Sequence, residues 1–268
     1  MLAYPDIDPV LLHIGPFQVR WYGLMYVLGF LASYLLVRYQ LKRVSFERLQ
    51  EHFENLNMVL IVSIIIGGRL GYVLFYNLPY YLAHPLEIPA TWSGGMSFHG
   101  AAIGLILGGS WYCRKKKIAF WKAADLYAVT IPIGLTLGRL GNFINGELFG
   151  RPTSLPWGMV FPAGGPLPRH PSQLYEAACE GVILFFVLWS LRRKPWQAGS
   201  RLWPHGSLLA LLLIGYGVLR FFIEFTREPD PQVGYILNMF TMGQILCAIM
   251  VIGGTAAWYL LVRHNDSA

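Results

Sequence analysis

The chain has 268 residues, of which 55% are apolar and only 13% are charged, and its mean hydropathy is +0.46. Soluble domains carry roughly 25% charged residues, so this composition excludes an ordinary soluble protein and indicates an integral membrane protein. The net charge of +7 does not indicate nucleic-acid binding, because the basic residues lie in short segments beside long apolar runs.

The first residues of the chain do not resemble a cleavable signal peptide. Residues 1–17 contain Pro5, Asp6, Asp8 and Pro9, and they have neither a basic start nor a long apolar centre. We therefore expect the first apolar segment to remain in the protein as a membrane anchor.

Seven stretches are long and apolar enough to cross a hydrocarbon layer about 30 Å thick as helices. They are expected at residues 19–37, 56–75, 95–113, 120–141, 174–191, 206–225 and 239–262. We predict an all-α integral membrane protein that forms a single polytopic domain over residues 1–268. Its one long connection, residues 142–173, is rich in proline, which opposes regular helix.

Lysine and arginine are unevenly distributed between the connecting segments. The segments after the first, third and fifth expected spans hold four basic residues each, whereas residues 76–94 hold none and 142–173 hold two. Because basic segments stay in the cytoplasm, the N-terminus is expected outside and the C-terminus inside. The long connection at 142–173 then lies on the outer side.

Polar side chains gather toward the outer ends of the expected spans. Arg139, Asn142 and Glu147 directly follow a long apolar run, and Tyr216, Arg220 and Glu224 are spaced to share one helix face. Charge at such a depth is costly unless it is paired, so these residues form a candidate functional site.

The arginines have two interpretations. They either make structural ion pairs with Glu147 and Glu224, or they bind an anion, since guanidinium makes bidentate bonds to phosphate and keeps its charge when desolvated. Two arginines near headgroup depth suit a phospholipid phosphate. For Arg69 we favour a structural role.

His99 precedes three glycines spaced four residues apart, Gly100, Gly104 and Gly108. That spacing predicts close helix packing, which would hold His99 rigidly. A histidine near a helix end is often merely hydrogen-bonded, but it can also accept a proton from a nucleophile near neutral pH.

Two further patterns have structural interpretations. Ser172 is expected to cap the fifth helix at its N-terminus, with Glu176 as a nearby partner of the helix dipole. Cys113, Cys179 and Cys247 lie in or beside apolar runs without metal-ligand spacing, so we interpret them as core residues.

Several motifs together resemble one protein family, that of the bacterial prolipoprotein diacylglyceryl transferases. The motifs occur in the family's order and cover nearly the whole chain: WYGLMY (21–26), GGMSFHG (94–100), GRLGNFINGELFG (138–150), RHPSQLYE (169–176), GYGVLR (215–220) and REPD (227–230). The resemblance implies seven spans with an outer N-terminus, in agreement with the charge distribution.

The resemblance also implies a reaction. The family transfers the diacylglyceryl group of phosphatidylglycerol to the thiol of the lipobox cysteine in a preprolipoprotein, in the bacterial inner membrane, and releases glycerol phosphate. His99, Arg139 and Arg220 are then the expected catalytic residues, and no metal or cofactor is expected. The expected substrate-binding residues are Tyr22, Asn142, Glu147, Gly150, His170, Tyr216 and Glu224.

Two other classes of protein use similar residues. A seven-span transporter or lipid channel would attract anionic cargo with the same arginines, although the polar set favours one side of the membrane rather than a path across it. A non-catalytic lipid-binding scaffold is the second alternative.

Overall fold

The computed structural model describes residues 2–5, 7–15, 17–197, 199–228, 235–236 and 240–266. The chain divides into two compact units. The first comprises Met1–Arg43 and Ala124–Ala268, and the second comprises Val44–Ala123. The expected residues Met239, Pro229 and Asp230 lie outside the described part of the chain.

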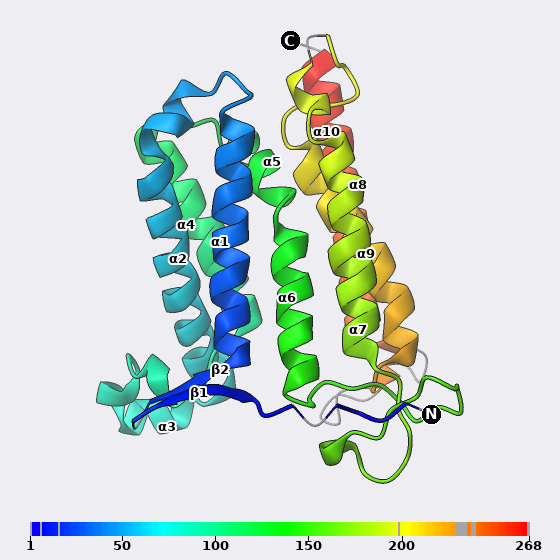
Figure 1. The fold of residues 1–268 in the computed structure, drawn as a ribbon. Coiled ribbons are helices and arrows are strands. Elements are labelled where there is room, and N and C mark those ends of the chain that lie inside the picture. Colours follow the sequence, from blue (N-terminus) through cyan, green and yellow to red (C-terminus); the bar gives the residue numbers. More distant parts are fainter. Residues whose placement is uncertain are drawn as a thin grey trace. The chain divides into compact units, whose positions relative to one another are not determined.

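The described residues of the first unit are mostly helical (Figure 1). Its elements are β1 (Val10–Ile14), β2 (Phe17–Arg20), α1 (Trp21–Leu41), α6 (Ile131–Ile144), α7 (Ser172–Glu176), the π-helix η4 (Ala177–Ile183), α8 (Leu184–Leu191), α9 (Ser207–Ile223), β3 (Tyr235–Ile236), β4 (Phe240–Thr241) and α10 (Met242–Asp266). Three short 3₁₀ turns join them at Pro162–Gly164, Lys194–Trp196 and Glu224–Thr226. Strands β1 and β2 form an antiparallel hairpin that the sequence had not predicted.

The second unit is built on two long helices, α2 (Glu47–Tyr76) and α4 (Phe98–Lys116). Between them lie the short helix α3 (Leu78–Ala83) and 3₁₀ turns at Pro85–Glu87 and Thr91–Ser93. A further helix, α5 (Phe120–Ala128), begins in this unit and continues into the first.

The single helix expected over residues 120–141 is wrong, because α5 ends at Ala128 and α6 starts at Ile131. Pro132 lies in the first turn of α6, where its missing N–H is tolerated, but it opposes helix through the preceding residues. The hydroxyl of Thr130 donates to the carbonyl of Tyr127 at 2.8 Å and pairs with Ser33 of α1 at 2.7 Å. Hydrogen bonds of Thr130 thus stabilise the break between α5 and α6.

Among the residues that the structure describes, five helical segments are long and apolar enough to cross a membrane, namely Trp21–Leu41, Glu47–Tyr76, Ser172–Trp196, Ser207–Thr226 and Met242–Asn265. Each coincides with one of the seven expected spans. The third expected span corresponds to α4, which ends in a basic turn, and the fourth corresponds to the broken pair α5 and α6. The protein is therefore a multi-pass helical membrane protein.

A buried carboxylate fastens the start of α9 to α5. The side chain of Asp125 is fully buried and accepts hydrogen bonds from the backbone N–H groups of Gly206, Leu208 and Leu209, at 2.7, 2.9 and 3.3 Å. These donors are among those that a helix start leaves unsatisfied, and the carboxylate also complements the helix dipole. Beside it, Leu188 of α8 and Leu208 of α9 belong to the unit's apolar core.

Glycines bring α2 and α4 into direct backbone contact in the second unit, as their spacing predicts. A Cβ atom added at Gly104 would lie 2.2 Å from the carbonyl oxygen of Ser63, and one at Gly100 would lie 2.3 Å from that of Gly67. A Cβ added at Gly108 would likewise lie 2.0 Å from the hydroxyl oxygen of Ser63. The predicted close packing is confirmed.

Arg69 closes one end of the same helix pair. Its guanidinium donates to the backbone carbonyls of Glu87, Ile88 and Gly94 at 2.8, 2.7 and 2.5 Å, and its side chain lies against the ring of Tyr81. It is only 4% exposed. The structural role expected for Arg69 is confirmed.

Replacing Gly104 by alanine is expected to destabilise the protein by about 1–3 kcal/mol, because the added methyl group must push α2 away from α4. Thermal unfolding of the detergent-solubilised protein would measure it. Gly134 of α6 is the matched control, since a Cβ there meets no atom within 4 Å, and its alanine variant should be neutral or more stable. Equal melting temperatures for the two variants would contradict the packing argument.

Candidate functional site

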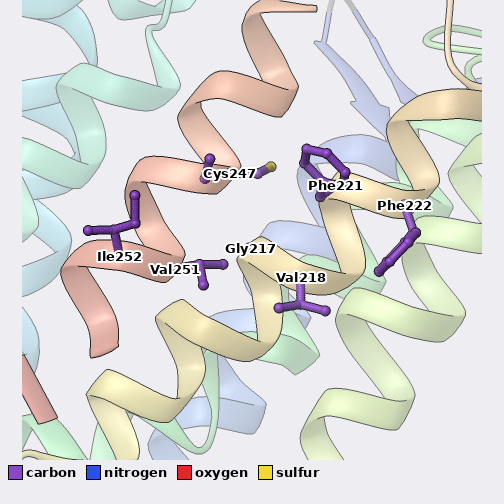
Figure 2. A pocket seen from close by; sticks show the side chains of 8 residues that line it. Gly217, Val218, Phe221, Phe222, Cys247, Val251 and Ile252 are labelled. Atoms are coloured by element: carbon purple, nitrogen blue, oxygen red, sulfur yellow. The ribbon is translucent and has the colours of Figure 1, made fainter. Parts of the chain in front are cut away.

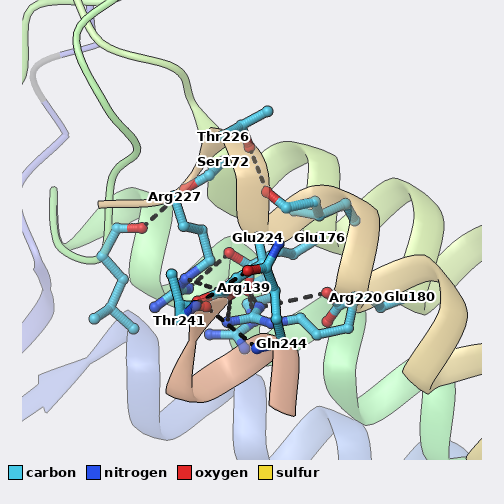
Figure 3. Close-up of polar contacts among 12 residues, drawn as sticks. Arg139, Ser172, Glu176, Glu180, Arg220, Glu224, Thr226, Arg227, Thr241 and Gln244 are labelled. Carbon is cyan, nitrogen blue, oxygen red and sulfur yellow. Dashed lines mark hydrogen bonds and ion pairs between the residues drawn. The ribbon is translucent and has the colours of Figure 1, made fainter. Parts of the chain in front are cut away.

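A buried carboxylate lies at the centre of a charged cluster in the first unit (Figure 3). Glu176, the last residue of α7, is fully buried and contacts three guanidinium groups. Its Oε2 atom forms an ion pair with Nε of Arg139 at 2.7 Å and accepts a hydrogen bond from Nη1 of Arg220, and its Oε1 atom accepts from Nη1 of Arg227 at 2.8 Å. One carboxylate therefore positions three arginines.

The guanidinium of Arg220 is surrounded by acidic groups. Besides Glu176, its Nη1 atom lies 3.4 Å from Oε1 of Glu180 and its Nη2 atom lies 3.1 Å from Oε2 of Glu224. The side chain is only 11% exposed. Burial of such a charge is tolerated because it is paired on several sides.

Glu224 is held in turn by the start of α10. The hydroxyl of Thr241 donates to Oε1 of Glu224 at 3.1 Å. A Cβ atom on Gly243 would lie only 2.5 Å from the same oxygen, so a larger residue at position 243 would make the carboxylate shift. The cluster thus contains three arginines and three glutamates, whose formal charges balance when all are ionised.

Arg139 is the most exposed of the three arginines and keeps donors without a strong partner. Its Nε atom is committed to Glu176, whereas Nη1 makes only a long contact of 3.4 Å with Oδ1 of Asn142. Within the described residues, Nη2 has no hydrogen-bond partner. The side chain is 20% exposed, about twice as much as that of Arg220. Arg139 therefore keeps donors for a ligand.

Asn142 and Glu147 extend the network of hydrogen bonds that begins at Arg139. The amide of Asn142 donates to Oε1 of Glu147 at 2.9 Å, and the amide of Asn145 donates to the same oxygen at 3.2 Å. Glu147 makes no ion pair with Arg139, so the structural interpretation of Arg139 holds with a different partner, Glu176. Arg220 does pair with Glu224, as the same interpretation allowed.

Two tyrosines predicted for the site lie on helices that border it. Tyr22 packs against α6, since a Cβ on Gly141 would meet its ring at 2.9 Å, and its hydroxyl lies 3.0 Å from that of Tyr26. Tyr216 lies one turn before Arg220 on α9 and is half-buried.

Gly150 and His170 lie where the long connection returns to the cluster. The N–H of Gly150 donates to the carbonyl of His170 at 2.8 Å, and a Cβ on Gly150 would lie 2.3 Å from the carbonyl oxygen of Thr226. The ring of His170 lies 3.3 Å from the hydroxyl of Tyr175, and partial burial lowers the pKa of His170 below its usual value. The ring is consequently neutral near pH 7.

Ser172 does not cap α7, so that expectation is wrong. Pro171 occupies the cap position, and Ser172 is the first residue of the helix. Its hydroxyl donates to the carbonyl of Leu148 at 3.1 Å, while the amide of Gln173 donates to that of Glu147 at 2.7 Å. Both side chains therefore anchor the chain that leaves α6.

His99 belongs to the second unit. It is exposed in the first turn of α4, next to the cap residue Ser97, whose hydroxyl accepts from the N–H of Gly100 at 3.2 Å. The cap and the packing of Gly100 against α2 fix the backbone that carries the histidine.

Three members of the cluster were not predicted as site residues: Glu176, Glu180 and Arg227. The signal for the first two is present in the sequence, because both are acidic residues in or beside an apolar run. Glu180 lies in the π-helix η4, a rare local geometry that is frequent at functional sites.

An apolar groove of about 240 Å³ lies between α9 and α10 (Figure 2). Its lining comprises Gly217, Val218, Phe221, Phe222, Cys247, Ala248, Val251 and Ile252. It has no charged or hydrogen-bonding side chain apart from the thiol of Cys247, so it does not provide an anion site. The chemistry available to the first unit lies in the charged cluster.

These features define a multi-pass membrane protein that holds three arginines in a buried network of glutamates, and the most exposed of them, Arg139, keeps donors for a ligand. Comparison with known proteins identifies the family within this class. The family model for prolipoprotein diacylglyceryl transferase matches residues 9–260. The chain belongs to this family, which is a family of transferases.

The chain is also similar over nearly its whole length to curated proteins called phosphatidylglycerol–prolipoprotein diacylglyceryl transferase. The protein of Desulfotalea psychrophila is 59% identical, with 98% of this chain and 97% of the relative covered. That of Bordetella avium is 50% identical, with 99% of both covered, and that of Geobacter sulfurreducens is 48% identical, with 98% and 99% covered.

Proposed function

We propose that the protein transfers the sn-1,2-diacylglyceryl group of phosphatidylglycerol to the thiol of the lipobox cysteine in a preprolipoprotein, the first step of bacterial lipoprotein maturation. Family membership and the names of its relatives support this reaction. The observation that carries it within the structure is Arg139, a guanidinium with free donors beside a buried charge network.

The proposed setting is the bacterial inner membrane, crossed seven times by one domain of residues 1–268, with the N-terminus outside and the C-terminus in the cytoplasm. The alternation of basic and neutral connecting segments supports this orientation. Tyr22, at the start of α1, packs against α6 at Gly141, two residues from Arg139. An outer N-terminus would therefore put the cluster, and the connection at 142–173, on the periplasmic side.

The proposed chemistry is a displacement at the glyceryl carbon that carries the phosphate. The thiolate of the substrate cysteine forms the new carbon–sulfur bond, and the carbon–oxygen bond breaks. Its electron pair leaves with glycerol phosphate, and the thiol proton passes to a base. Since the reacting cysteine belongs to the substrate, none of the protein's own cysteines takes part.

The two catalytic arginines would then act differently. Arg139 would donate from Nη1 and Nη2 to the phosphate and stabilise the charge that develops as it leaves. Arg220 is already engaged by Glu176, Glu180 and Glu224, so its effect would be to hold the network and add positive potential.

The remaining predicted residues would shape the binding site. Asn142 and Glu147, linked to Arg139 by hydrogen bonds, would accept or orient the glycerol hydroxyls of the headgroup. Tyr22 and Tyr216 would border the headgroup, while Glu224 would keep Arg220 in place. Gly150 and His170 would hold the connection at 142–173 against this end of the unit.

The test is direct. The purified protein is incubated with labelled phosphatidylglycerol and a lipobox peptide, and a thioether-linked diacylglyceryl peptide is the expected product. A peptide with serine in place of the acceptor cysteine should give none. Lipid movement or binding without this product would instead indicate a transporter or a scaffold.

Replacing His99 by glutamine is expected to lower the transfer rate by about 10²–10⁴-fold at pH 7, because a general base typically contributes that much. The variant would rely on spontaneous ionisation of the thiol, whose usual pKa is about 8.5. Its rate should thus rise about tenfold per pH unit below that value, more steeply than that of the unchanged protein.

The matched control is His84→Gln, since His84 lies in the same unit and stacks on Tyr80. It should keep its activity and its pH profile. If His99→Gln retains near-normal transfer at pH 7, His99 is not the base, and the arginines alone activate the thiol.

A further inference from the structure

A second group of arginines lies at the opposite end of the first unit, around the end of α1 and the end of α8. The guanidinium of Arg43 lies 4.4 Å from the ring centre of Tyr39, and that of Arg192 lies 4.1 Å from the ring centre of Trp189. The two rings stack, with centroids 6.0 Å apart and planes inclined by 23°. We call these four residues the arginine–aromatic stack.

This stack is far from the candidate active site. Tyr22, beside the site, starts α1, and Tyr39 lies near its end. Seventeen residues of α-helix separate the two along the chain, or about 25 Å at 1.5 Å per residue. A molecule bound at the stack would therefore lie near the other surface of the membrane.

The stack is positively charged without acidic compensation. Arg43 and Arg192 repel one another, and Arg193 adds a third charge nearby. None of the three makes an ion pair with a residue that the structure describes. One donor of Arg192 bonds to the carbonyl of Trp189 at 2.5 Å, which leaves its other donors available. By contrast, the arginines of the active-site cluster are all paired with glutamates.

We propose that the arginine–aromatic stack binds the headgroup of an anionic phospholipid. Guanidinium groups that are stacked on rings have a fixed orientation and can give bidentate bonds to phosphate. Tyr39 is 40% exposed at the end of a membrane-spanning helix, where aromatic rings border the headgroup layer. Basic pockets between such helix ends are suited to anionic lipid headgroups.

The inference is independent of the transfer reaction. It concerns a different end of the unit, and none of its residues belongs to the charged cluster around Glu176. A lipid held there would join α1 to α8, which meet at the stack through Tyr39 and Trp189. Its expected effect is on lipid affinity and stability rather than on the chemical step.

The test is a titration of the purified full chain by native mass spectrometry. The probe is phosphatidylserine, which is anionic but lacks the glycerol headgroup, and phosphatidylcholine is the neutral comparison. The Arg43→Gln, Arg192→Gln double variant should bind phosphatidylserine about 30-fold more weakly, since each basic residue near an anionic lipid contributes about fivefold.

The charge-matched control is Arg38→Gln, Arg201→Gln, which removes one positive charge from the last turn of α1 and one from the segment between α8 and α9 but leaves the stack intact. It should lose less than threefold in affinity. An equal loss in both double variants means that only diffuse charge attracts the lipid, and this would overturn the site. Displacement of the lipid by inorganic phosphate alone would also overturn it in favour of a simple ion site.

A second double variant distinguishes loss of the site from misfolding. Arg43→Lys, Arg192→Lys keeps the net charge but removes the planar groups, so the proposed site predicts a loss of at least fivefold. Unchanged affinity in this variant contradicts a built headgroup site. If the proposed reaction is correct, transfer from phosphatidylglycerol should be the same in all of these variants. If no transfer is found, the phosphatidylserine affinities still decide whether the stack binds lipid.

Discussion

Replacing Arg139 by lysine is expected to lower the kcat of diacylglyceryl transfer by about 10²–10³-fold, with little change in thermal stability. Lysine keeps the positive charge beside Glu176 but lacks the second and third donors that Nη1 and Nη2 of Arg139 present. Loss of a donor that stabilises developing charge typically costs this much in rate.

The measurement is steady-state transfer with phosphatidylglycerol and a lipobox peptide, with kcat and KM determined separately. A fall in kcat means that Arg139 acts mainly in the transition state, and a rise in KM alone means uniform binding of the headgroup. Arg20→Lys is the control, because Arg20 is exposed before α1 and, among the described residues, its side chain donates only to Oε1 of Gln18, at 3.5 Å. Near-normal transfer by the Arg139 variant would remove the arginine from the mechanism.

Replacing Glu176 by glutamine should have the largest effect on stability. The change leaves Arg139, Arg220 and Arg227 without the carboxylate that they share. Removing one partner from a buried ion pair typically costs about 3–5 kcal/mol. For a chain of this size that corresponds to a fall in the melting temperature of roughly 10 °C. Transfer should be lost as well, because Arg139 loses its orientation.

Glu147→Gln is the matched control for this prediction. Glu147 is exposed and accepts hydrogen bonds from Asn142 and Asn145 without an ion pair to a described arginine. Its melting temperature should fall by less than 2 °C on the usual scale for exposed polar groups. If Glu176→Gln melts as high as this control, the arginines do not depend on a shared carboxylate, and the description of the cluster is wrong.

Most of the helices could be predicted from the long apolar stretches of the sequence. Every stretch predicted to cross the membrane coincides with a helix or, at residues 120–141, with two. The glycines of α4 were also predictable, because a spacing of four puts them on one face. The break after Ala128 was not predicted, since hydropathy over a long window is insensitive to a single proline at position 132.

The sequence by itself determined the class of protein and the positions of most helices, and it predicted Arg139 and Arg220 as site residues, since charge in an apolar segment is costly and therefore conspicuous. Only the tertiary structure decided which carboxylate each arginine meets. Glu176 is far from all three of its arginines in the chain, and packing of α6, α7 and α9 brings them together. Local spacing can propose a partner such as Glu147 or Glu224. Glu176 becomes the shared partner because it is fully buried, and a buried carboxylate charge is tolerated only when it is paired.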